Sequence, residues 1–445
     1  MFISTHIQCW RAMVYLLYDL ILFVASLFLV PYAFIKGLPY GNSLKGVCQR
    51  LGFYSGFDLQ ALCGKQVFWV HAASVGEVRA SFPLIKALKD KFPESRIVLS
   101  GMTFTGQQVA CEAADVDLVV FSPFDLSLVV KRSFRLIQPD VVIIIETEIW
   151  PNFIRIAEEN SIPLVLANGR ISKKSFPRYL SIKSLVKPLL EKISAFAMQD
   201  ATCARRIKAL GAPPELVQVT GNMKFDLPVS MPGTVAILDD QVKKKLLAGK
   251  FVWVAGSIRS GEAEILLQCH KQLISRGIPS FPIFAPRHPG CCISVAELLK
   301  KEDIPFALRS SLGKEKKGGE EVQILLVDTV GELTKFYALA DVIFVGGSLV
   351  PVGGHNLLEP AQQGKPVLFG SHISNFKEIS RLLLACGGGI KVGSGDELVS
   401  CLVELYRNEQ LCDQMGQAGL TLIRENVGAT EKTLSSICRI LESKK

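Results

Sequence analysis

The stretch VVIIIETEIWPN, residues 141–152, combines the features that decide the fold of this chain. It begins with five consecutive β-branched residues, which is typical of a strand that is buried on both faces of a parallel sheet. Glu146 and Glu148 follow the strand, and Pro151 suits the first turn of a helix. The stretch therefore predicts a strand, a polar turn and a helix, which together form the repeating unit of an α/β domain.

Short apolar runs of the same kind recur along the chain and are separated by segments of helical length. In the first half they are QVFWV (66–70), RIVLS (96–100), DLVVF (117–121), VVIIIE (141–146), PLVLAN (163–168) and SAFAMQ (194–199). In the second half they are FVWVAG (251–256), PSFPIFA (279–285), QILLVD (323–328), DVIFVGG (341–347) and KPVLFG (365–370). This rhythm predicts an α/β fold with two doubly wound, Rossmann-like domains that face a cleft.

The 445 residues divide into four predicted parts. Residues 1–37 form a membrane anchor, and residues 38–222 form an N-terminal α/β domain. Residues 223–250, which contain LPVSMPG and a charged run, form a linker. Residues 251–445 form a C-terminal α/β domain. The carboxyl ends of the strands, where ligands bind in such sheets, are expected to carry the site.

The N-terminal segment 15–35 is apolar and carries a single charge, Asp19. As a helix it is about 30 Å long, which is enough to cross a bilayer. A cleavable signal peptide is the alternative, but the apolar run is longer than such peptides usually have. Asp19 and Pro31 leave open whether the helix spans the bilayer or lies within one leaflet.

Composition limits the partners and the compartment. The chain has 50 basic and 41 acidic residues, a net charge of +9, which suits an anionic partner. Basic residues that follow the anchor favour cytoplasmic domains, and the twelve scattered cysteines favour a reducing compartment. No spacing of histidines and cysteines predicts a metal site. Only 8% of the residues are aromatic, so stacking on nucleic acid is not expected.

The motif HAASVGE, residues 71–77, follows the first predicted strand and opens a helix. A carboxylate at a helix N-terminus is stabilised in its charged form, so Glu77 is a candidate general base. The alternative is a routine capping box, in which Ser74 and Glu77 only start the helix. Glu146, after the strand at 141–145, is expected at the same edge of the sheet.

Segment 170–192 carries seven basic residues and one acidic residue. Its interleaved apolar residues suit a helix on an anionic membrane surface or at a phosphorylated lipid, and a solvated helix face is the alternative.

In the second half, four strand ends carry polar residues that together predict a nucleotide-phosphate cradle. They are GSIRSGE (256–262), PRHP (286–289), GGSLVPVGGHNLLE (346–359) and GSHISNF (370–376). Arginines and a glycine-rich turn favour an anion, and Glu359 suits the ribose hydroxyls. No GxGxxG or GxxxxGK[ST] motif follows a strand, which disfavours dehydrogenases and P-loop NTPases.

The motifs HAASVGE, SGMTFTG, ETEIWPN, ANGRISKKS, GNMKFD, PRHP, GGSLVPVGGHNLLEPA and GSHISNF occur in the order that resembles the bacterial 3-deoxy-D-manno-octulosonic acid (Kdo) transferases. The resemblance implies a GT-B glycosyltransferase of the lipopolysaccharide inner core. It implies transfer of Kdo from CMP-Kdo, a substrate, to a lipid A precursor (lipid IVA), once or repeatedly, with inversion and without metal or cofactor. It also implies an inner-membrane enzyme whose domains lie on the cytoplasmic side.

The resemblance also assigns residues. Glu77 becomes the catalytic base. The acceptor-binding residues become Ser74, Gly76, Glu146, Asn168, Arg170 and Lys173. The donor-binding residues become Arg259, Arg287, His288, Gly353, Gly354, His355, Asn356, Glu359 and Asn375. Two departures, Gly290-Cys291 after PRHP and Pro351-Val352 before GGHN, replace charged pairs that are common in the family.

Two other functions fit the same sequence features. A different GT-B protein that uses a UDP-sugar has the same domain pattern. A membrane protein without catalytic activity, which binds nucleotide or anionic lipid, has the same cradle and basic segment.

Overall fold

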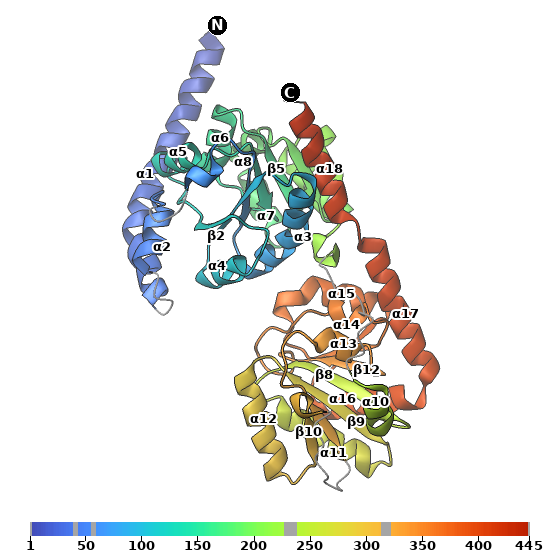
Figure 1. Cartoon of the computed structure of the whole chain (residues 1–445). Helices are drawn as coiled ribbons and strands as arrows, with labels where there is room; N and C mark the ends of the chain where they lie inside the picture. The colour runs from blue at the N-terminus through green and yellow to red at the C-terminus, as the bar shows by residue number, and fades with distance from the viewer. Residues whose placement is uncertain (1, 39–42, 55–58, 227–237, 313–321, 444–445) are drawn as a thin grey trace. The chain divides into compact units, whose positions relative to one another are not determined.

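The computed structural model describes residues 2–38, 43–54, 59–226, 238–312 and 322–443. The chain forms two compact units. Unit 1 comprises Met1–Leu227 and Asn426–Lys445, and unit 2 comprises Pro228–Glu425. Each is built around a sheet of seven strands (Figure 1).

The sheet of unit 1 has the strand order β3-β2-β1-β4-β5-β6-β7, and all its strand pairs are parallel. The strands are β1 (Val67–Ala72), β2 (Arg96–Gly101), β3 (Leu118–Phe121), β4 (Val141–Ile145), β5 (Leu164–Gly169), β6 (Ala195–Met198) and β7 (Val217–Val219). Every residue of β1, β4 and β5 is buried, as expected for strands covered on both faces. The order reverses between β1 and β4, so these two strands flank the switch point at which ligands bind in such sheets.

The helices of unit 1 cover both faces of this sheet. They are α1 (Phe2–Gly37), α2 (Ser43–Arg50), α3 (Val75–Lys91), α4 (Phe104–Cys111), α5 (Ser127–Ile137), α6 (Pro151–Glu159), α7 (Phe176–Ser181), α8 (Lys183–Leu190), α9 (Ala201–Leu210) and α18 (Ala429–Glu442). The described residues of this unit also contain the 3₁₀ turns η2 (Leu59–Leu62), η3 (Pro214–Leu216) and η4 (Met223–Asp226).

Unit 2 repeats the doubly wound pattern with the order β10-β11-β9-β8-β12-β13-β14, again with parallel pairs. Its strands are β8 (Phe251–Ile258), β9 (Ser280–Pro286), β10 (Phe306–Leu308), β11 (Ile324–Leu326), β12 (Val342–Val345), β13 (Val367–Phe369) and β14 (Gly389–Lys391). Its switch point lies between β8 and β12.

The helices of unit 2 are α10 (Asp240–Leu247), α11 (Ala263–Ser275), α12 (Pro289–Lys301), α13 (Leu333–Tyr337), α14 (Leu358–Ala361), α15 (Lys377–Cys386), α16 (Gly395–Arg407) and α17 (Glu409–Asn426). The part of unit 2 that the structure describes also contains the 3₁₀ turns η5 (Arg309–Ser311) and η6 (Ser374–Phe376). The predicted α/β fold with two doubly wound domains is therefore confirmed.

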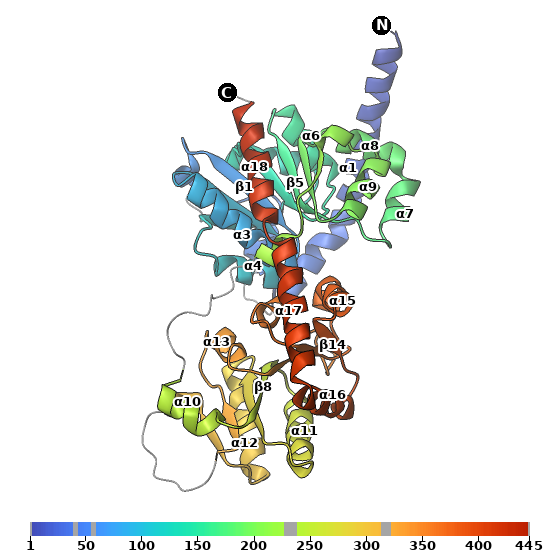
Figure 2. The ribbon, with the colours of Figure 1, turned by 90° about the vertical axis from the view of Figure 1, so that its right-hand side faces the viewer.

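The predicted domain boundaries differ from the structure at the C-terminus. The prediction placed residues 251–445 in one domain, but α18 belongs to unit 1 (Figure 2). Ala429 and Ile437 are buried in the core of unit 1, where α18 contacts α3, β5 and β6. Asp226 accepts hydrogen bonds from the backbone N–H groups of Gly428 (2.7 Å) and Thr430 (2.6 Å), which begins α18 there. An apolar helix face packs wherever a complementary core lies, whatever its position in the sequence.

The predicted linker 223–250 is also partly folded. Met223 and Phe225 in η4 are buried in unit 1, and α10 belongs to unit 2. The central part of the predicted linker, residues 227–237, lies outside the described residues.

Candidate active site

The acceptor-side candidates lie at or just after the carboxyl ends of three neighbouring strands of unit 1. Ser74, Gly76 and Glu77 follow β1, and Glu146 follows β4. Asn168 is the second-last residue of β5, and Arg170 and Lys173 lie in the loop that follows. Because β1, β4 and β5 are adjacent and parallel, the topology brings these loops to one edge of the sheet.

Glu77 lies in the first turn of α3 and makes the capping contacts that its sequence pattern predicts. Its Oε2 accepts a hydrogen bond from the Ala73 N–H (2.8 Å), and its Oε1 accepts one from the Ser74 hydroxyl (2.8 Å). The Ser74 side chain in turn caps the helix by accepting from the Glu77 N–H. Capping thus holds the carboxylate in one position, and it is compatible with a catalytic role.

The surroundings of Glu77 go beyond an ordinary helix cap. Burial raises its pKa, and the negative charge of Glu146 raises it further. The hydrogen bonds from Ser74 and Ala73 and the charge of Lys224 act in the opposite direction. A half-buried carboxylate with a raised pKa is a stronger base than an exposed one, which suits general-base chemistry.

Glu146 is held by a residue that the sequence analysis did not single out. Its Oε1 accepts from the Lys224 ammonium at 2.9 Å, and Lys224 lies in η4. Glu146 has a φ of 62°, a left-handed conformation that costs free energy in a residue other than glycine. The motif GNMKFD contains Lys224, but nothing in its local pattern indicated a partner 78 residues away.

Glu148, which follows the same strand as Glu146, is half-buried. Burial raises its pKa to about 7, and the charge of Glu77 contributes to the rise. Three carboxylates, those of Glu77, Glu146 and Glu148, therefore interact electrostatically at this edge, with Lys224 as a counter-ion. Such a cluster of mutually perturbed acids is typical of a functional site.

The raised pKa of Glu148 predicts a pH dependence of stability. Below about 4.5, its ordinary pKa, the residue is protonated in both the folded and the unfolded chain. Between that value and about 7 only the unfolded chain loses the proton, so ionisation disfavours folding as the pH rises. Glu148→Gln should therefore raise the melting temperature at pH 8 and leave it unchanged near pH 4. The exposed Glu112→Gln is the control, and equal gains in both variants would refute the assignment.

The β5 loop has a structural as well as a candidate binding role. Asn168 is buried, has a φ of 55°, and accepts from the Met223 N–H through its Oδ1 (3.0 Å). The Arg170 N–H donates to the Thr147 hydroxyl (3.3 Å), which ties this loop to the β4 loop. Lys173 is exposed.

The donor-side candidates belong to unit 2 and follow β8, β9, β12 and β13. The Arg259 Nε donates to the His355 Nε2 at 3.2 Å, which orients the guanidinium. Arg287 and His288 are exposed, and the pKa of His288 is lowered by desolvation and then by the charges of Arg259 and Arg287. These three side chains therefore lie within electrostatic range of one another.

The glycine-rich loop after β12 meets the β13 loop. Gly353 has a φ of 103°, and a Cβ there would approach the Asn375 Nδ2 to 2.6 Å. The Asn375 N–H donates to the Gly353 carbonyl (3.0 Å). Asn356 donates through Nδ2 to the Oε1 of Glu359 (3.0 Å), which follows it in the short α14. The loop thus needs glycine at position 353 for both conformation and space.

Glu262, the last residue of the motif GSIRSGE, has a role that its sequence pattern does not indicate. Its carboxylate is completely buried and accepts from the backbone N–H groups of Arg259 (2.9 Å), Gly347 (2.6 Å), Ser348 (3.0 Å) and Leu349 (3.0 Å). The backbone N–H groups at the start of the glycine-rich loop therefore bind the side-chain carboxylate of Glu262. Only a tertiary contact across 85 or more residues reveals this.

His270 is 1% exposed and hydrogen-bonded to the Ser280 Oγ (3.1 Å).

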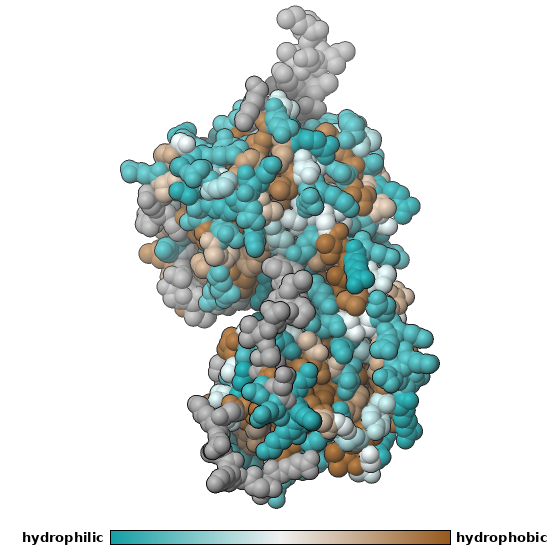
Figure 3. All heavy atoms as spheres, turned by 45° about the vertical axis from the view of Figure 1, so that its right-hand side comes forward, coloured by the Kyte–Doolittle hydropathy of each residue, from teal (hydrophilic) through white to brown (hydrophobic). Residues whose placement is uncertain are grey.

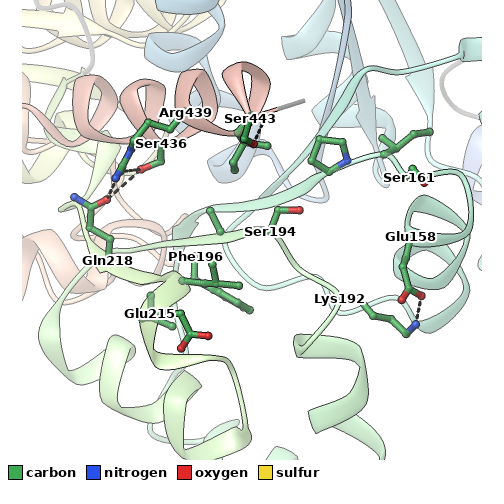
Figure 4. A pocket seen from close by; sticks show the side chains of 16 residues that line it. Glu158, Ser161, Lys192, Ser194, Phe196, Glu215, Gln218, Ser436, Arg439 and Ser443 are labelled. Carbon is green, nitrogen blue, oxygen red and sulfur yellow. Dashed lines mark hydrogen bonds and ion pairs between the residues drawn. The ribbon is translucent and has the colours of Figure 1, made fainter. Parts of the chain in front are cut away.

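A cavity of about 890 Å³ lies at the opposite edge of the first sheet, near the amino ends of β5, β6 and β7. Figure 4 shows Gln218, Ser436 and Arg439 on one side of it and the Glu158–Lys192 ion pair on the other. None of the candidate site residues lines it.

Known proteins are similar to this chain over most of its length. Residues 45–227 match the family model of 3-deoxy-D-manno-octulosonic-acid transferase (kdotransferase). The chain is 36% identical over 397 residues to a 3-deoxy-D-manno-octulosonic acid transferase of Haemophilus influenzae, covering 88% of this chain and 92% of that one. It is 34% identical over 324 residues to a probable mitochondrial transferase of this name from Arabidopsis thaliana, covering 71% of each chain.

Solved structures support the fold. UDP-GlcNAc 2-epimerase from Neisseria meningitidis aligns with a TM-score of 0.54 at 14% identity, covering 84% of this chain and 100% of that one. At this identity the likeness concerns the GT-B architecture alone. With the relatives above, which align over most of their length, it leads to one conclusion: the chain belongs to the Kdo transferase family and is a glycosyltransferase of the GT-B fold.

Proposed function

We propose that this protein transfers Kdo from CMP-Kdo to a lipid A precursor such as lipid IVA, with inversion at the anomeric carbon. The observation that carries the proposal is the Glu77 carboxylate, which is half-buried, fixed by two hydrogen bonds and next to other acids at the switch point between β1 and β4. Kdo is proposed as the transferred sugar because the relatives are named as Kdo transferases. The acceptor and the repetition of transfer follow from the family resemblance.

In the proposed reaction Glu77 accepts the proton of an acceptor hydroxyl. The hydroxyl oxygen then attacks the anomeric carbon of Kdo, and the bond to the phosphate of CMP breaks. CMP leaves with the electron pair and an additional negative charge on its phosphate. A single displacement by one base inverts the configuration. Ser74 and Ala73 hold the base in place, and Lys224 favours its ionised form.

The proposed donor site uses Arg259, Arg287, His288 and the loop from Gly353 to Glu359, with Asn375. Guanidinium groups bind phosphate and carboxylate through paired hydrogen bonds, and both groups occur in CMP-Kdo. Charge stabilisation of the departing phosphate by these cations is expected to lower the barrier without a metal ion. Transfer that persists in EDTA would support this part of the proposal.

The proposal is tested with purified protein, CMP-Kdo and detergent-dispersed lipid IVA. Formation of Kdo-lipid IVA, with the anomeric configuration opposite to that of the donor by NMR, is the expected result. Transfer from a UDP-sugar in place of CMP-Kdo would favour the alternative transferase. Binding of nucleotide without any transfer would favour the non-catalytic alternative.

We further propose that the basic segment 170–192 binds the acceptor phosphates or acidic headgroups at the membrane. Lys173, Lys174, Arg178 and Lys183 are exposed on and around α7 and α8. Changing these four residues to Gln should raise the KM for acceptor at low salt and leave CMP-Kdo affinity unchanged. The difference should shrink as salt screens exposed charges.

The matched control changes Lys243, Lys244, Lys245 and Lys300 to Gln, which removes the same charge from exposed positions of unit 2. A similar acceptor KM in both variants would identify segment 170–192 as a solvated helix face.

A further inference from the structure

The apolar helix α1 lies along unit 1 with one face against protein. Half-buried residues recur every three or four positions through the candidate membrane span, at Tyr15, Tyr18, Asp19, Leu22, Ala25, Ser26 and Val30. Residues with this spacing share one face of a helix. Figure 1 shows α1 beside α2 and α5 of the same unit. A helix that crosses a bilayer alone would instead meet lipid on all sides.

Asp19 and Tyr18 fasten this face to unit 1. The Asp19 carboxylate accepts from the Ser127 N–H (3.1 Å), the Ser127 hydroxyl (2.5 Å) and the Asn152 Nδ2 (2.7 Å). The Tyr18 hydroxyl donates to Asp125 (3.0 Å). Ser127 and Asn152 lie in the first turns of α5 and α6, whose positive ends favour a carboxylate. We call these five residues the clamp.

The segment that follows α1 contacts unit 1 close to the Asp19 contact. The Phe124 N–H donates to the Arg50 carbonyl at the end of α2 (2.8 Å), only three residues before Ser127. Asp19 contacts Ser127 and Arg50 contacts Phe124. These two contact points on unit 1 are at most about 11 Å apart, because three residues separate them. If residues 19–37 crossed the bilayer, residues 38–50 would have to recross about 30 Å of hydrocarbon. These residues include α2, in which Gln49 and Arg50 are buried in unit 1.

The opposite face of α1 is apolar and exposed. The fractional exposure of Leu20, Phe23, Leu27 and Phe28 is 59–74%. The exposed large side chains of this face are Leu16, Leu17, Leu20, Ile21, Phe23, Val24, Leu27, Phe28, Tyr32, Phe34 and Ile35, none of which is charged. By contrast, the surface seen in Figure 3 is mainly hydrophilic, with scattered hydrophobic groups.

We infer that α1 is a monotopic membrane helix. The half-buried face of α1, the clamp and the contact between Arg50 and Phe124 support this inference. The helix lies along unit 1 and buries its exposed apolar face among the acyl chains of one leaflet, without crossing the bilayer. Acyl chains are the occupant because this long face carries no charge and, apart from the Tyr32 hydroxyl, no polar group with which to recognise a protein partner specifically. In this arrangement the Asp19 carboxylate does not contact the acyl chains, because it faces unit 1.

The clamp also connects the membrane to the candidate active site. Asn152 and Asp125 hold the start of α6, with Asp125 accepting from the Asn152 and Phe153 N–H groups (3.0 and 2.8 Å). Helix α6 begins directly after the loop that carries Glu146 and Glu148. Membrane-bound α1 therefore acts as a positioning element for that loop.

Topology is tested with cleavable tags at both ends of the full chain, in sealed vesicles whose catalytic units face outward. The C-terminal tag follows α18 of unit 1 and reports the side of the catalytic units. Added protease should remove both tags to the same extent without detergent. An N-terminal tag that stays protected until detergent is added, while the C-terminal tag is cleaved, would overturn the inference. This result does not depend on which sugar or acceptor the enzyme uses.

The occupant of the apolar face is tested by flotation with phosphatidylethanolamine–phosphatidylglycerol vesicles. Changing Leu20 and Leu27 together to Ser should reduce the floated fraction at least tenfold, whereas Ala25→Ser on the protein-facing stripe should not. A parent protein that remains a dimer and does not float, and that becomes monomeric in the double variant, would show that a second copy covers this face and would overturn the lipid assignment.

The clamp is tested by hydrogen exchange in the full-length protein. Asp19→Ala and Ser127→Ala should each accelerate exchange at least tenfold both in α1 and in the first turns of α6, and the double variant should add little to either. Ser26→Ala is the control, since the Ser26 hydroxyl donates to the Phe23 carbonyl within α1 itself (2.6 Å). Acceleration confined to α1 in Asp19→Ala would show that the helix does not position α6.

Discussion

Replacing Glu77 by Gln is expected to reduce Kdo transfer by about 10² to 10⁴-fold, which is the usual contribution of a positioned general base. Binding of CMP-Kdo should change by less than about twofold, because the donor-side candidates belong to unit 2. Gln has nearly the same shape and keeps an oxygen that accepts from the Ala73 N–H, so helix α3 should remain capped. Single-turnover transfer and equilibrium CMP-Kdo binding measure the two effects separately.

The chain provides a matched control for this prediction in unit 2. Ser394 caps α16, and Glu397 three residues later accepts from the Gly393 N–H (2.6 Å), which repeats the cap of Ser74 and Glu77. Glu397→Gln should alter stability by a similar small amount and leave transfer unchanged. If Glu77→Gln also keeps parental transfer, Glu77 is only a helix cap. A circular dichroism spectrum identical to the parent's is required of both variants.

Glu262→Ala is expected to destabilise unit 2 by about 3–5 kcal/mol, the usual cost of removing one partner of a buried charged network. The four backbone N–H groups that now donate to Glu262 would lose their acceptor inside the protein. Because one of them belongs to Arg259 and three to the start of the glycine-rich loop, CMP-Kdo affinity should fall as well. Urea unfolding and CMP-Kdo titration measure the two losses.

Glu264→Ala is the matched control, because Glu264 lies two residues away in the first turn of α11 and is exposed. It should change the free energy of unfolding by less than about 0.5 kcal/mol. A Glu262→Ala protein within about 1 kcal/mol of this control would show that water replaces the carboxylate, and that the loop does not depend on it.

The central strands could be predicted from the sequence because burial on both faces leaves a signal in it. Strands β1, β4, β8 and β12 read as continuous apolar runs, and the structure has them within two residues of the predicted positions. The strands that sequence analysis missed are β7, β10 and β14, each only three residues long. All three lie at sheet edges and are partly exposed, so their residues need no apolar pattern.

Sequence alone determined the α/β class, the apolar N-terminal helix and the loops that carry the candidate site, since each depends on local periodicity or on a motif at a strand end. Tertiary structure decided the rest. It places α18 in unit 1 and pairs Lys224 with Glu146. It also brings the Glu262 carboxylate to the backbone N–H groups of the glycine-rich loop, and Asp19 to the first turns of α5 and α6. Each of these contacts joins residues at least 78 positions apart or depends on which core lies nearby. A hydrogen bond or ion pair of that kind requires only a donor and an acceptor at one point in space, so it leaves no periodic trace in the sequence.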